Sequence, residues 1–446
     1  MPYQSISSQF HYYLQRDYIG NRSESVNPIK SYQEDVEQWA LTAKKRMHEH
    51  CQCLLKAAAN PRLLAEAINQ IGRYEILGDD AKVAGPNWFP WEQLRNLKKE
   101  VLSGSFRRGK YRKVKIPKIG KEGSRTIEIP DDASRILSRN LCTLLTPMLD
   151  PDFYDLSIGF RPRRSQAHGI AAAKLLVDQG KHHMVACDVR DAFGSVPKVR
   201  LLQILRSRLH QSPAMGLIEE LLDRKRKRGI PQGLSLSPLC LNVYLDHLFD
   251  HWWSEQFPDT TLVRYADDIA VFADTRAAAI DAYGAICQRM QSAGLQIKES
   301  QQDAIFDLTS NDHVEWLGFS LRLMNGDLDA VLGHSAWDKL HASLLEIRAR
   351  LKNNELSLDH DVSQSGCQWL VQKSVAINEA AVPAVADQVR QLAAHAGLNM
   401  SSLNDEKAHE AWSRGQEFAK RAEKNVSEWM QSHEIVEVDE HVGQQF

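Results

Sequence analysis

The spacing of apolar positions along the chain separates two helical ends from a mixed centre. Apolar residues recur at helical intervals up to about residue 100, as in PRLLAEAINQI, and again from about residue 335, as in HSAWDKLHASLLEIRARLKNN. In between, short β-branched runs such as YRKVKIP and RTIEIP stand on either side of the turn signal GKEG. Strands and helices mixed in the middle, with helical ends, predict an α+β fold whose catalytic centre lies between two helical parts.

Three apolar runs in the centre are predicted to be buried strands. HHMVACDV is the first, and TLVRYA and IAVFA are the other two, on either side of Asp267 and Asp268. We expect these two aspartates to form the two-residue turn of a β-hairpin. The pattern therefore puts two carboxylates at the tip of an otherwise apolar hairpin.

Length and composition are those of an ordinary globular protein. The chain has 446 residues, of which 43% are apolar and 25% charged, enough for two or three domains. No run of about 18 apolar residues occurs, and the first residues lack the pattern of a secretory signal. We therefore expect a cytoplasmic protein without a membrane partner. Seven scattered cysteines without zinc-like spacing are expected to be reduced thiols.

The formal net charge of −2 hides two strongly basic clusters. Residues 105–125 contain nine Lys or Arg and one Glu, and residues 224–228 read Arg-Lys-Arg-Lys-Arg. A single cluster could be a solvated face. Two clusters in a nearly neutral protein favour a polyanionic ligand, because phosphate contacts need concentrated positive charge.

Three aspartates are the candidates for catalysis and metal binding. Asp267 and Asp268 cannot both stay ionised at close range without a cation, although a turn chosen for its backbone preference is the plainer alternative. Asp188 ends the upstream strand, and Asp191, past that strand end, is expected to be structural. Three carboxylates from two strands can hold two Mg²⁺ or Mn²⁺ ions about 4 Å apart, an arrangement that serves phosphoryl transfer.

The order and content of these segments resemble the reverse-transcriptase family, particularly its bacterial branch related to group II intron enzymes. The Tyr265-Ala266-Asp267-Asp268 box is similar to the family signature, and the likeness runs in order from Ile116 to Phe319. The resemblance implies a right-hand polymerase with an antiparallel palm sheet. Its expected parts are a helical N-terminal extension (1–100), fingers (101–187), palm (188–325), helical thumb (326–396) and helical C-terminal tail (397–446).

The resemblance also implies roles for single residues, several of which could equally be surface or core residues. Those matching contacts to the incoming nucleotide are Lys118, Arg125, Phe193, Gln232 and Lys298. A bulky ring at Phe193 would collide with a 2′-hydroxyl, which implies dNTP substrates and a DNA product. Those expected to contact nucleic acid are Arg161, Arg163, Arg164, Arg224, Lys225, Arg226, Tyr265 and the primer-grip residue Gly318.

Features of related subclasses narrow the expected biology. The sequence shows neither a His/Cys-rich endonuclease cluster nor the Val-Thr-Gly triplet usual in retron enzymes, and its Pro-Gln-Gly…Ser-Pro box, residues 231–238, is intact. The chain therefore most resembles bacterial antiviral-defence reverse transcriptases, which copy a dedicated noncoding RNA template into cDNA. The alternative is a compact intron-type maturase that acts mainly as an RNA-binding scaffold. The sequence does not indicate a protein partner.

Overall fold

The structure is a computed structural model that describes residues 48, 50–74, 91–117, 124–310, 313–351 and 360–442. Of the expected nucleotide contacts, Lys118 lies outside the described residues, and only the backbone of Arg125 is described. No helix in the described part of the chain is long and apolar enough to cross a membrane.

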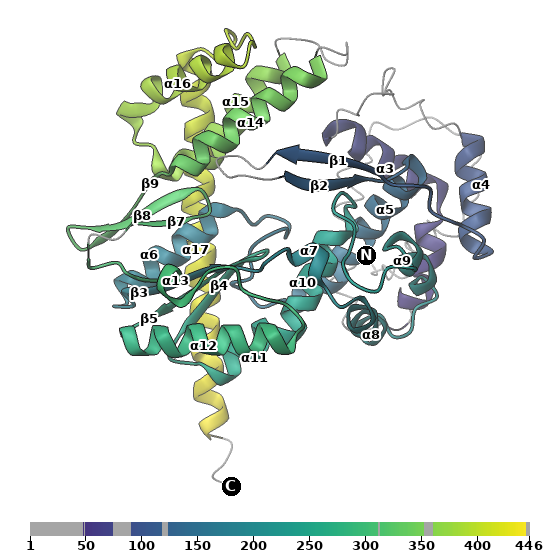
Figure 1. The fold of residues 1–446 in the computed structure, drawn as a ribbon, viewed down its shortest axis with the longest axis horizontal. Coiled ribbons are helices and arrows are strands. Elements are labelled where there is room, and N and C mark those ends of the chain that lie inside the picture. The colour runs from purple at the N-terminus through teal and green to yellow at the C-terminus, as the bar shows by residue number, and fades with distance from the viewer. Residues whose placement is uncertain are drawn as a thin grey trace, which may run out of the picture.

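The first described elements form a helical cluster that carries a two-stranded hairpin. The elements are α3 (Pro61–Tyr74), α4 (Trp91–Leu102), β1 (Arg112–Pro117), β2 (Ser124–Ile129) and α5 (Asp132–Leu149). The two strands pair antiparallel along their whole length. Asp131 precedes α5, and its side chain caps the helix by accepting a hydrogen bond from the backbone N–H of Ser134 at 3.1 Å. In Figure 1 the hairpin projects from the cluster toward the upper helices of the molecule.

A four-stranded antiparallel sheet occupies the centre, with strand order β4-β5-β3-β6. Its strands are β3 (His183–Asp188), β4 (Thr261–Tyr265), β5 (Asp268–Ala273) and β6 (Ile305–Asp307). Every residue of β5 after Asp268 is buried, which explains why this strand reads as an unbroken apolar run. Helix α12 (Arg276–Ser292) packs against β3 and β5, and α6 (Gln166–Asp178) packs against β4.

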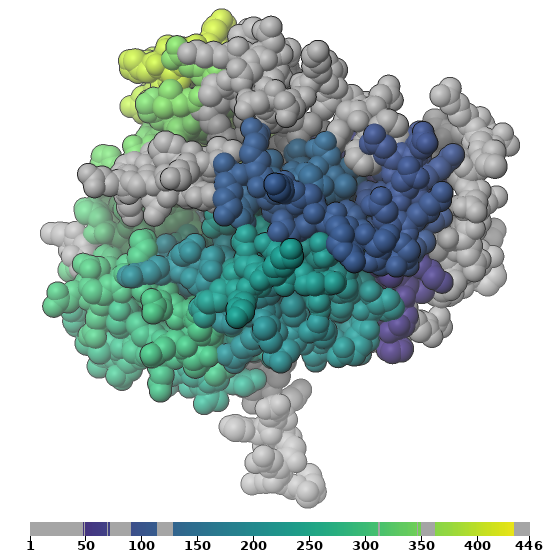
Figure 2. Space-filling model, turned by 45° about the vertical axis from the view of Figure 1, so that its right-hand side comes forward, coloured from purple at the N-terminus to yellow at the C-terminus, as the bar shows by residue number. Residues whose placement is uncertain are grey.

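Short helices join the hairpin cluster to the central sheet. They are α7 (Ala192–Ser195), α8 (Lys198–Arg208), α9 (Met215–Leu221), α10 (Leu236–Leu245), a π-helical turn (Asp246–Asp250), α11 (His251–Gln256) and α13 (Gln301–Ala304). α10 packs against both α5 and α8, so it links the two parts through a shared apolar core. Figure 2 shows the segment around residues 100–113 (blue) lying against the segment around residues 200–240 (teal).

The second half of the chain adds a small sheet and a helical unit. The sheet contains β7 (Val314–Trp316), β8 (Phe319–Met324) and β9 (Asp327–Leu332), and the helices are α14 (His334–Leu351), α15 (His360–Lys373) and α16 (Val382–His395). These helices enclose a separate apolar core that includes Leu344, Leu370 and Val389. The helical thumb proposed from the sequence (326–396) covers these helices together with β9.

The C-terminal helix α17 (Asp405–Val442) ties that helical unit to the central sheet. Its buried positions recur at helical spacing and carry small side chains: Ala408, Ala411, Ala419, Ala422 and Val426. A Cβ at Gly415 would collide with Ser374 and with the backbone of Val371, so a glycine is needed where α17 crosses the end of α15. α17 packs along α15 and α6, and Figure 1 shows it (yellow) running from the upper helices past the sheet.

The predicted α+β class, with an antiparallel sheet between helical parts, is confirmed. The domain boundaries proposed from the sequence lie inside units of the structure. The boundary between residues 187 and 188 lies at the last residue of β3, and the boundary between residues 325 and 326 lies in the turn between β8 and β9. Strand pairing therefore joins residues on both sides of each boundary.

Candidate active site

Asp188, Asp267 and Asp268 meet at one end of the central sheet. Asp188 in β3 lies directly opposite Asp268 in β5. Tyr265 also pairs with Asp268, so the hairpin turn is Ala266-Asp267. The prediction of an Asp267-Asp268 turn was therefore wrong by one residue. Ala266 has φ 59°, the positive value that the first position of this tight turn needs, and Asp268 is thereby free to pair within the strand.

The three carboxylates concentrate negative charge in a partly buried place. Burial and the nearby Asp188 raise the pKa of Asp267 to about 6. Burial, Asp188 and Asp267 together raise the pKa of Asp268 to about 7. Both shifts show that the ionised forms are costly here, because like charges repel where water is scarce.

Lys298, which the sequence assigned to the incoming nucleotide, lies beside these carboxylates. Its Nζ lies 3.2 Å from Asp188 Oδ2 and 3.0 Å from Glu299 Oε1. The other oxygen of Glu299 accepts a hydrogen bond from the backbone N–H of Asp188 at 2.7 Å. Burial alone would lower the pKa of Lys298, but its contacts with Glu299 and Asp188 raise it. Glu299 was not singled out from the sequence, although it directly follows Lys298.

A divalent cation fits the chemistry of this donor set. The ligands are carboxylate oxygens, which Mg²⁺ prefers, and a cation would relieve the repulsion that raises the pKa values of Asp267 and Asp268. As the side chains stand, no three His, Cys, Asp or Glu among the described residues are gathered closely enough to hold an ion. One oxygen of Asp188, Oδ2, is paired with Lys298.

The hairpin that carries Asp267 is held by a buried arginine that sequence reasoning missed. The Arg264 side chain is 0% exposed, and its Nε donates to Asp250 Oδ1 at 2.8 Å. Its Nη1 donates to the carbonyl of Ala266 at 2.7 Å, directly at the turn. Its Nη2 donates to the other oxygen of Asp250, and Asn242 and Ser157 also accept hydrogen bonds from its guanidinium. The available signal was the single charge inside the apolar run TLVRYA.

The loop before α6 packs against the back of the hairpin turn. The backbone N–H of Ile158 donates to the carbonyl of Arg264 at 2.7 Å, and a Cβ at Gly159 would collide with the backbone of Tyr265 and Ala266. A glycine is therefore required at this close approach. The next residue, Phe160, has φ 59° and is 53% exposed.

Phe160 brings a second aromatic ring to the predicted nucleotide contacts. Its ring lies edge-on to that of Phe193, with centroids 6.5 Å apart. The carbonyl of Phe193 accepts a hydrogen bond from the backbone N–H of Ile230 at 2.8 Å, and the carbonyl of Gln232 accepts one from Glu128 at 2.8 Å. Backbone contacts thus join α7 to the loop before α10, and that loop to β2.

The three arginines of the loop have different surroundings. Arg161 is buried and donates to Asp150 and to the carbonyls of Tyr154 and Ser157. The expectation of an open phosphate contact at Arg161 is therefore corrected, because its guanidinium is occupied by the chain's own acceptors. Arg163 lies exposed at φ 59°.

Arg164 connects the same loop to the C-terminal helix. It bonds to Asp155, and its guanidinium carbon lies 4.0 Å from the ring centroid of Trp429. The ring of Trp429 also stacks on that of His168, with centroids 5.4 Å apart and an interplanar angle of 14°. Trp429 in α17 therefore braces this loop, a contact that sequence spacing did not indicate.

The remaining residues predicted to contact nucleic acid are Tyr265, Gly318 and residues 224–226. Tyr265 is half-buried beside Asp268. Gly318 has φ 77° in the turn between β7 and β8, where a Cβ would lie 2.8 Å from Lys373 Nζ. The three basic residues 224–226 line a separate pocket at the base of the β1–β2 hairpin. The structure thus brings the aspartates, Lys298 and Tyr265 together and keeps the basic cluster apart.

Comparison with known proteins places this site in a recognised class. Residues 116–321 match the family model described as Reverse transcriptase (RNA-dependent DNA polymerase). The chain thus contains a reverse transcriptase domain, which includes all three aspartates.

The chain is also similar to individual proteins over part of its length. Protein YkfC of Escherichia coli is 30% identical over 250 residues, which are 51% of this chain and 63% of that protein. The Group II intron-encoded protein LtrA of Lactococcus lactis is 25% identical over 36% of this chain and 28% of its own length. The matched segment is thus under two thirds of either relative. A solved structure titled "Partial Cas6-RT-Cas1--Cas2 complex" aligns with a TM-score of 0.33 at 22% identity, over 54% of this chain and 41% of that one.

Proposed function

We propose that this chain is an RNA-directed DNA polymerase that extends a primer by nucleotidyl transfer from dNTPs. The observation that carries the proposal is the pairing of Asp188 with Asp268 beside Asp267, within the segment that the reverse transcriptase family model matches. Carboxylates on adjacent strands suit a two-metal site, and phosphoryl transfer depends chiefly on positioning and charge neutralisation.

Under this proposal each part of the site has a defined task. Asp188, Asp267 and Asp268 hold two Mg²⁺ ions, whose chemistry when bound is to activate the primer 3′-hydroxyl and neutralise charge on the transferred phosphoryl group. Arg264 keeps the turn in place through the carbonyl of Ala266. Lys298 supplies positive charge where pyrophosphate leaves, after its pair with Asp188 opens.

Primer extension on an RNA template tests the proposal. The wild-type protein should incorporate labelled dNTPs in Mg²⁺ and stop on chelation. Asp268→Asn keeps the side-chain shape but removes a charge, and should slow incorporation by about 10³-fold or more. Asp274→Asn is the matched control, because Asp274 is exposed just past β5 and pairs only loosely with Lys181 at 3.4 Å. Equal activity of Asp268→Asn and wild type would refute the assignment.

Phe193 is proposed to select deoxynucleotides. Its half-buried ring lies edge-on to that of Phe160. Its backbone carbonyl accepts a hydrogen bond from the backbone N–H of Ile230. Phe193→Val should therefore raise ribonucleotide incorporation relative to dNTP incorporation, since the ring no longer excludes a 2′-hydroxyl. Phe193→Tyr keeps the ring and should keep the selectivity. An unchanged ratio in Phe193→Val would remove this residue as the gate.

We further propose that the template is a dedicated noncoding RNA and that its cDNA serves antiphage defence in the cytoplasm. The support is the intact box at residues 231–238 together with the resemblance to bacterial antiviral-defence reverse transcriptases. The maturase alternative makes the opposite prediction for the Asp267→Ala/Asp268→Ala double variant. Loss of phage protection with normal RNA binding supports the polymerase, whereas retained protection supports an RNA-binding scaffold.

A further inference from the structure

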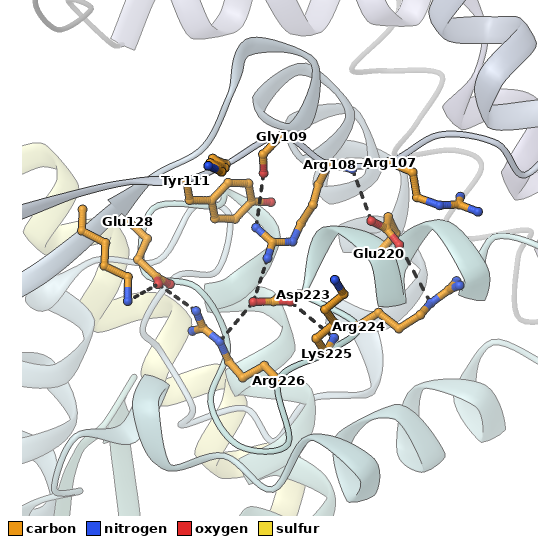
Figure 3. A pocket seen from close by; sticks show the side chains of 12 residues that line it. Arg107, Arg108, Gly109, Tyr111, Glu128, Glu220, Asp223, Arg224, Lys225 and Arg226 are labelled. Carbon is orange, nitrogen blue, oxygen red and sulfur yellow. Dashed lines mark hydrogen bonds and ion pairs between the residues drawn. The ribbon is translucent and has the colours of Figure 1, made fainter.

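Two basic runs that are far apart in the sequence line one pocket. The pocket has a volume of about 700 Å³ and lies between the segment that precedes β1 and the turn that follows α9 (Figure 3). Its basic residues are Arg107, Arg108, Lys110, Lys113, Arg224, Lys225 and Arg226, and its acidic residues are Glu128, Glu220 and Asp223. Seven cations against three anions leave an excess of four positive charges.

The floor of the pocket is built from arginine–carboxylate pairs. Arg108 lies 2.8 Å from Asp223, and Arg226 lies 2.7 Å from Glu128 and 3.6 Å from Asp223. Tyr111 completes the floor, because its hydroxyl donates to the carbonyl of Leu221 at 2.9 Å. Figure 3 shows these side chains turned toward one another. These pairs hold the two basic runs together, so Arg108 and Arg226 already have carboxylate partners within the pocket.

The rim, by contrast, carries exposed cations that have long ion-pair contacts or none. Lys110 and Lys225 are exposed, and neither side chain forms an ion pair within the described part of the chain. Lys113 is 69% exposed with a long 3.8 Å contact to Glu128, and Arg224 is 54% exposed at 3.9 Å from Glu220. Such rim charges stay hydrated in the free protein and can release counterions to a phosphate chain.

The pocket also offers a flat surface beside the cations. The Arg108 guanidinium lies over the ring of Tyr111, 4.6 Å from its centroid. Proteins that hold single strands without strong sequence preference combine a basic groove with planar groups of this kind. A free triphosphate would need only a compact cluster of cations, whereas these are spread along the rim of an open pocket.

The place of the pocket connects it to the candidate active site. The pair Lys113↔Glu128 is four residues along the hairpin from Pro117↔Ser124 at its far end, roughly 13 Å. Glu128 also donates its backbone N–H to the carbonyl of Gln232. The pocket is thus separate from the expected nucleotide contacts but reachable by a strand that leads to them.

We propose that this pocket binds the unpaired nucleic-acid strand ahead of the copied position, with Lys110 and Lys225 as phosphate contacts. The inference rests on the proposed polymerase function, because only copying gives the strand a direction. It joins the nucleic-acid contacts expected at residues 224–226 to the facing basic run at residues 107–113, outside the aspartates and the expected dNTP contacts.

Fluorescence anisotropy with a labelled RNA–DNA primer–template tests the pocket. One substrate has a blunt template end and the other a ten-nucleotide unpaired 5′ RNA extension. The wild-type protein should bind the extended substrate more tightly. Lys110→Ala/Lys225→Ala should lose most of that gain, and the slope of log Kd against log salt should fall by about 1.4, roughly 0.7 for each lost phosphate contact to a single strand.

The matched control is Lys420→Ala/Lys424→Ala, which removes the same charge from the exposed side of α17. It should retain the gain and the slope. The pocket is refuted if the extension does not tighten wild-type binding, or if the two double variants lose the gain equally. dNTP incorporation on the extended substrate at saturating protein concentration, measured in parallel, reports on the polymerase proposal alone, so the two failures are distinguishable.

Discussion

The hairpin end of the central sheet and the basic pocket beside the β1–β2 hairpin use charge in opposite ways. At the hairpin, Arg264 and Asp250 are both 0% exposed and paired with each other. At the pocket, cations outnumber acids and the rim lysines stay in solvent. The buried Arg264–Asp250 pair fixes the position of a backbone turn. Exposed cations in excess can still form ion pairs with a charged ligand and release their counterions. Charge at one region therefore serves the fold, and at the other we propose that it serves binding.

The first prediction tests whether burial makes the Arg264–Asp250 pair important for stability, by removing the carboxylate of Asp250. Asp250→Ala should lower the free energy of unfolding by about 3–5 kcal/mol, because an uncompensated buried charge remains. Urea unfolding followed by circular dichroism measures this. Asp387→Ala removes an acid from the exposed Arg390–Asp387 pair and should cost under about 1 kcal/mol. Similar losses in both variants would show that burial is not what distinguishes the two regions.

The second prediction concerns Lys373, a buried amine that forms no ion pair within the described residues. Its Nζ donates to the carbonyl of Leu317 at 3.1 Å and to Gln166 Oε1 at 2.9 Å, two bonds that a neutral amine can also make. Burial and the nearby Lys339 lower the pKa of Lys373 to about 7, although Glu315 acts in the opposite direction.

The sign of the resulting pH dependence follows from proton binding. In the unfolded chain the lysine has a pKa of about 10.4 and keeps its proton up to that pH, whereas in the folded protein it releases the proton near pH 7. Folding is therefore favoured as pH rises between these values, by up to about 1.4 kcal/mol per pH unit, and this gain is lost as pH falls toward 7. Lys373→Met should flatten the change in unfolding free energy between pH 7 and 9. An unaltered slope would mean that Lys373 stays charged.

Third, Trp429→Ala should loosen the loop that packs behind the hairpin. The variant loses the stack on His168 and the contact with Arg164, and should cost about 1–2 kcal/mol, since the ring is only half-buried. Trp429→Phe keeps a ring and should recover part of the loss in thermal melts. If the melting temperature of Trp429→Ala matches wild type, α17 does not brace the loop.

The sequence predicted the strands of the palm better than the contacts that support them. β3, β4 and β5 coincide with apolar runs because neighbouring elements bury them on both faces. The turn was misplaced by one residue because Ala266 adopts φ 59°, a conformation that its residue type does not indicate. The partner of Arg264 could not be predicted either, because a π-helical turn aims Asp250 at it.

The sequence also did not indicate that the two basic runs, at residues 105–125 and 224–228, lie side by side. Each run was visible as a charge pattern, but their convergence depends on the Arg108–Asp223 and Arg226–Glu128 pairs, which are tertiary contacts. Sequence patterns report local periodicity and charge, whereas contacts between distant segments follow from how the whole chain packs.

The smallest expected effect sharpens the comparison most. Lys110→Ala/Lys225→Ala should change the free energy of unfolding by less than about 0.5 kcal/mol, because both side chains are exposed and neither belongs to the floor pairs. Arg108→Ala, which leaves Asp223 with fewer partners, should cost more, about 1 kcal/mol. Thermal melts of the two variants compare rim and floor directly. A larger loss from the rim variant would mean that the lysines stabilise the pocket itself, and that their charge is not held in reserve for a ligand.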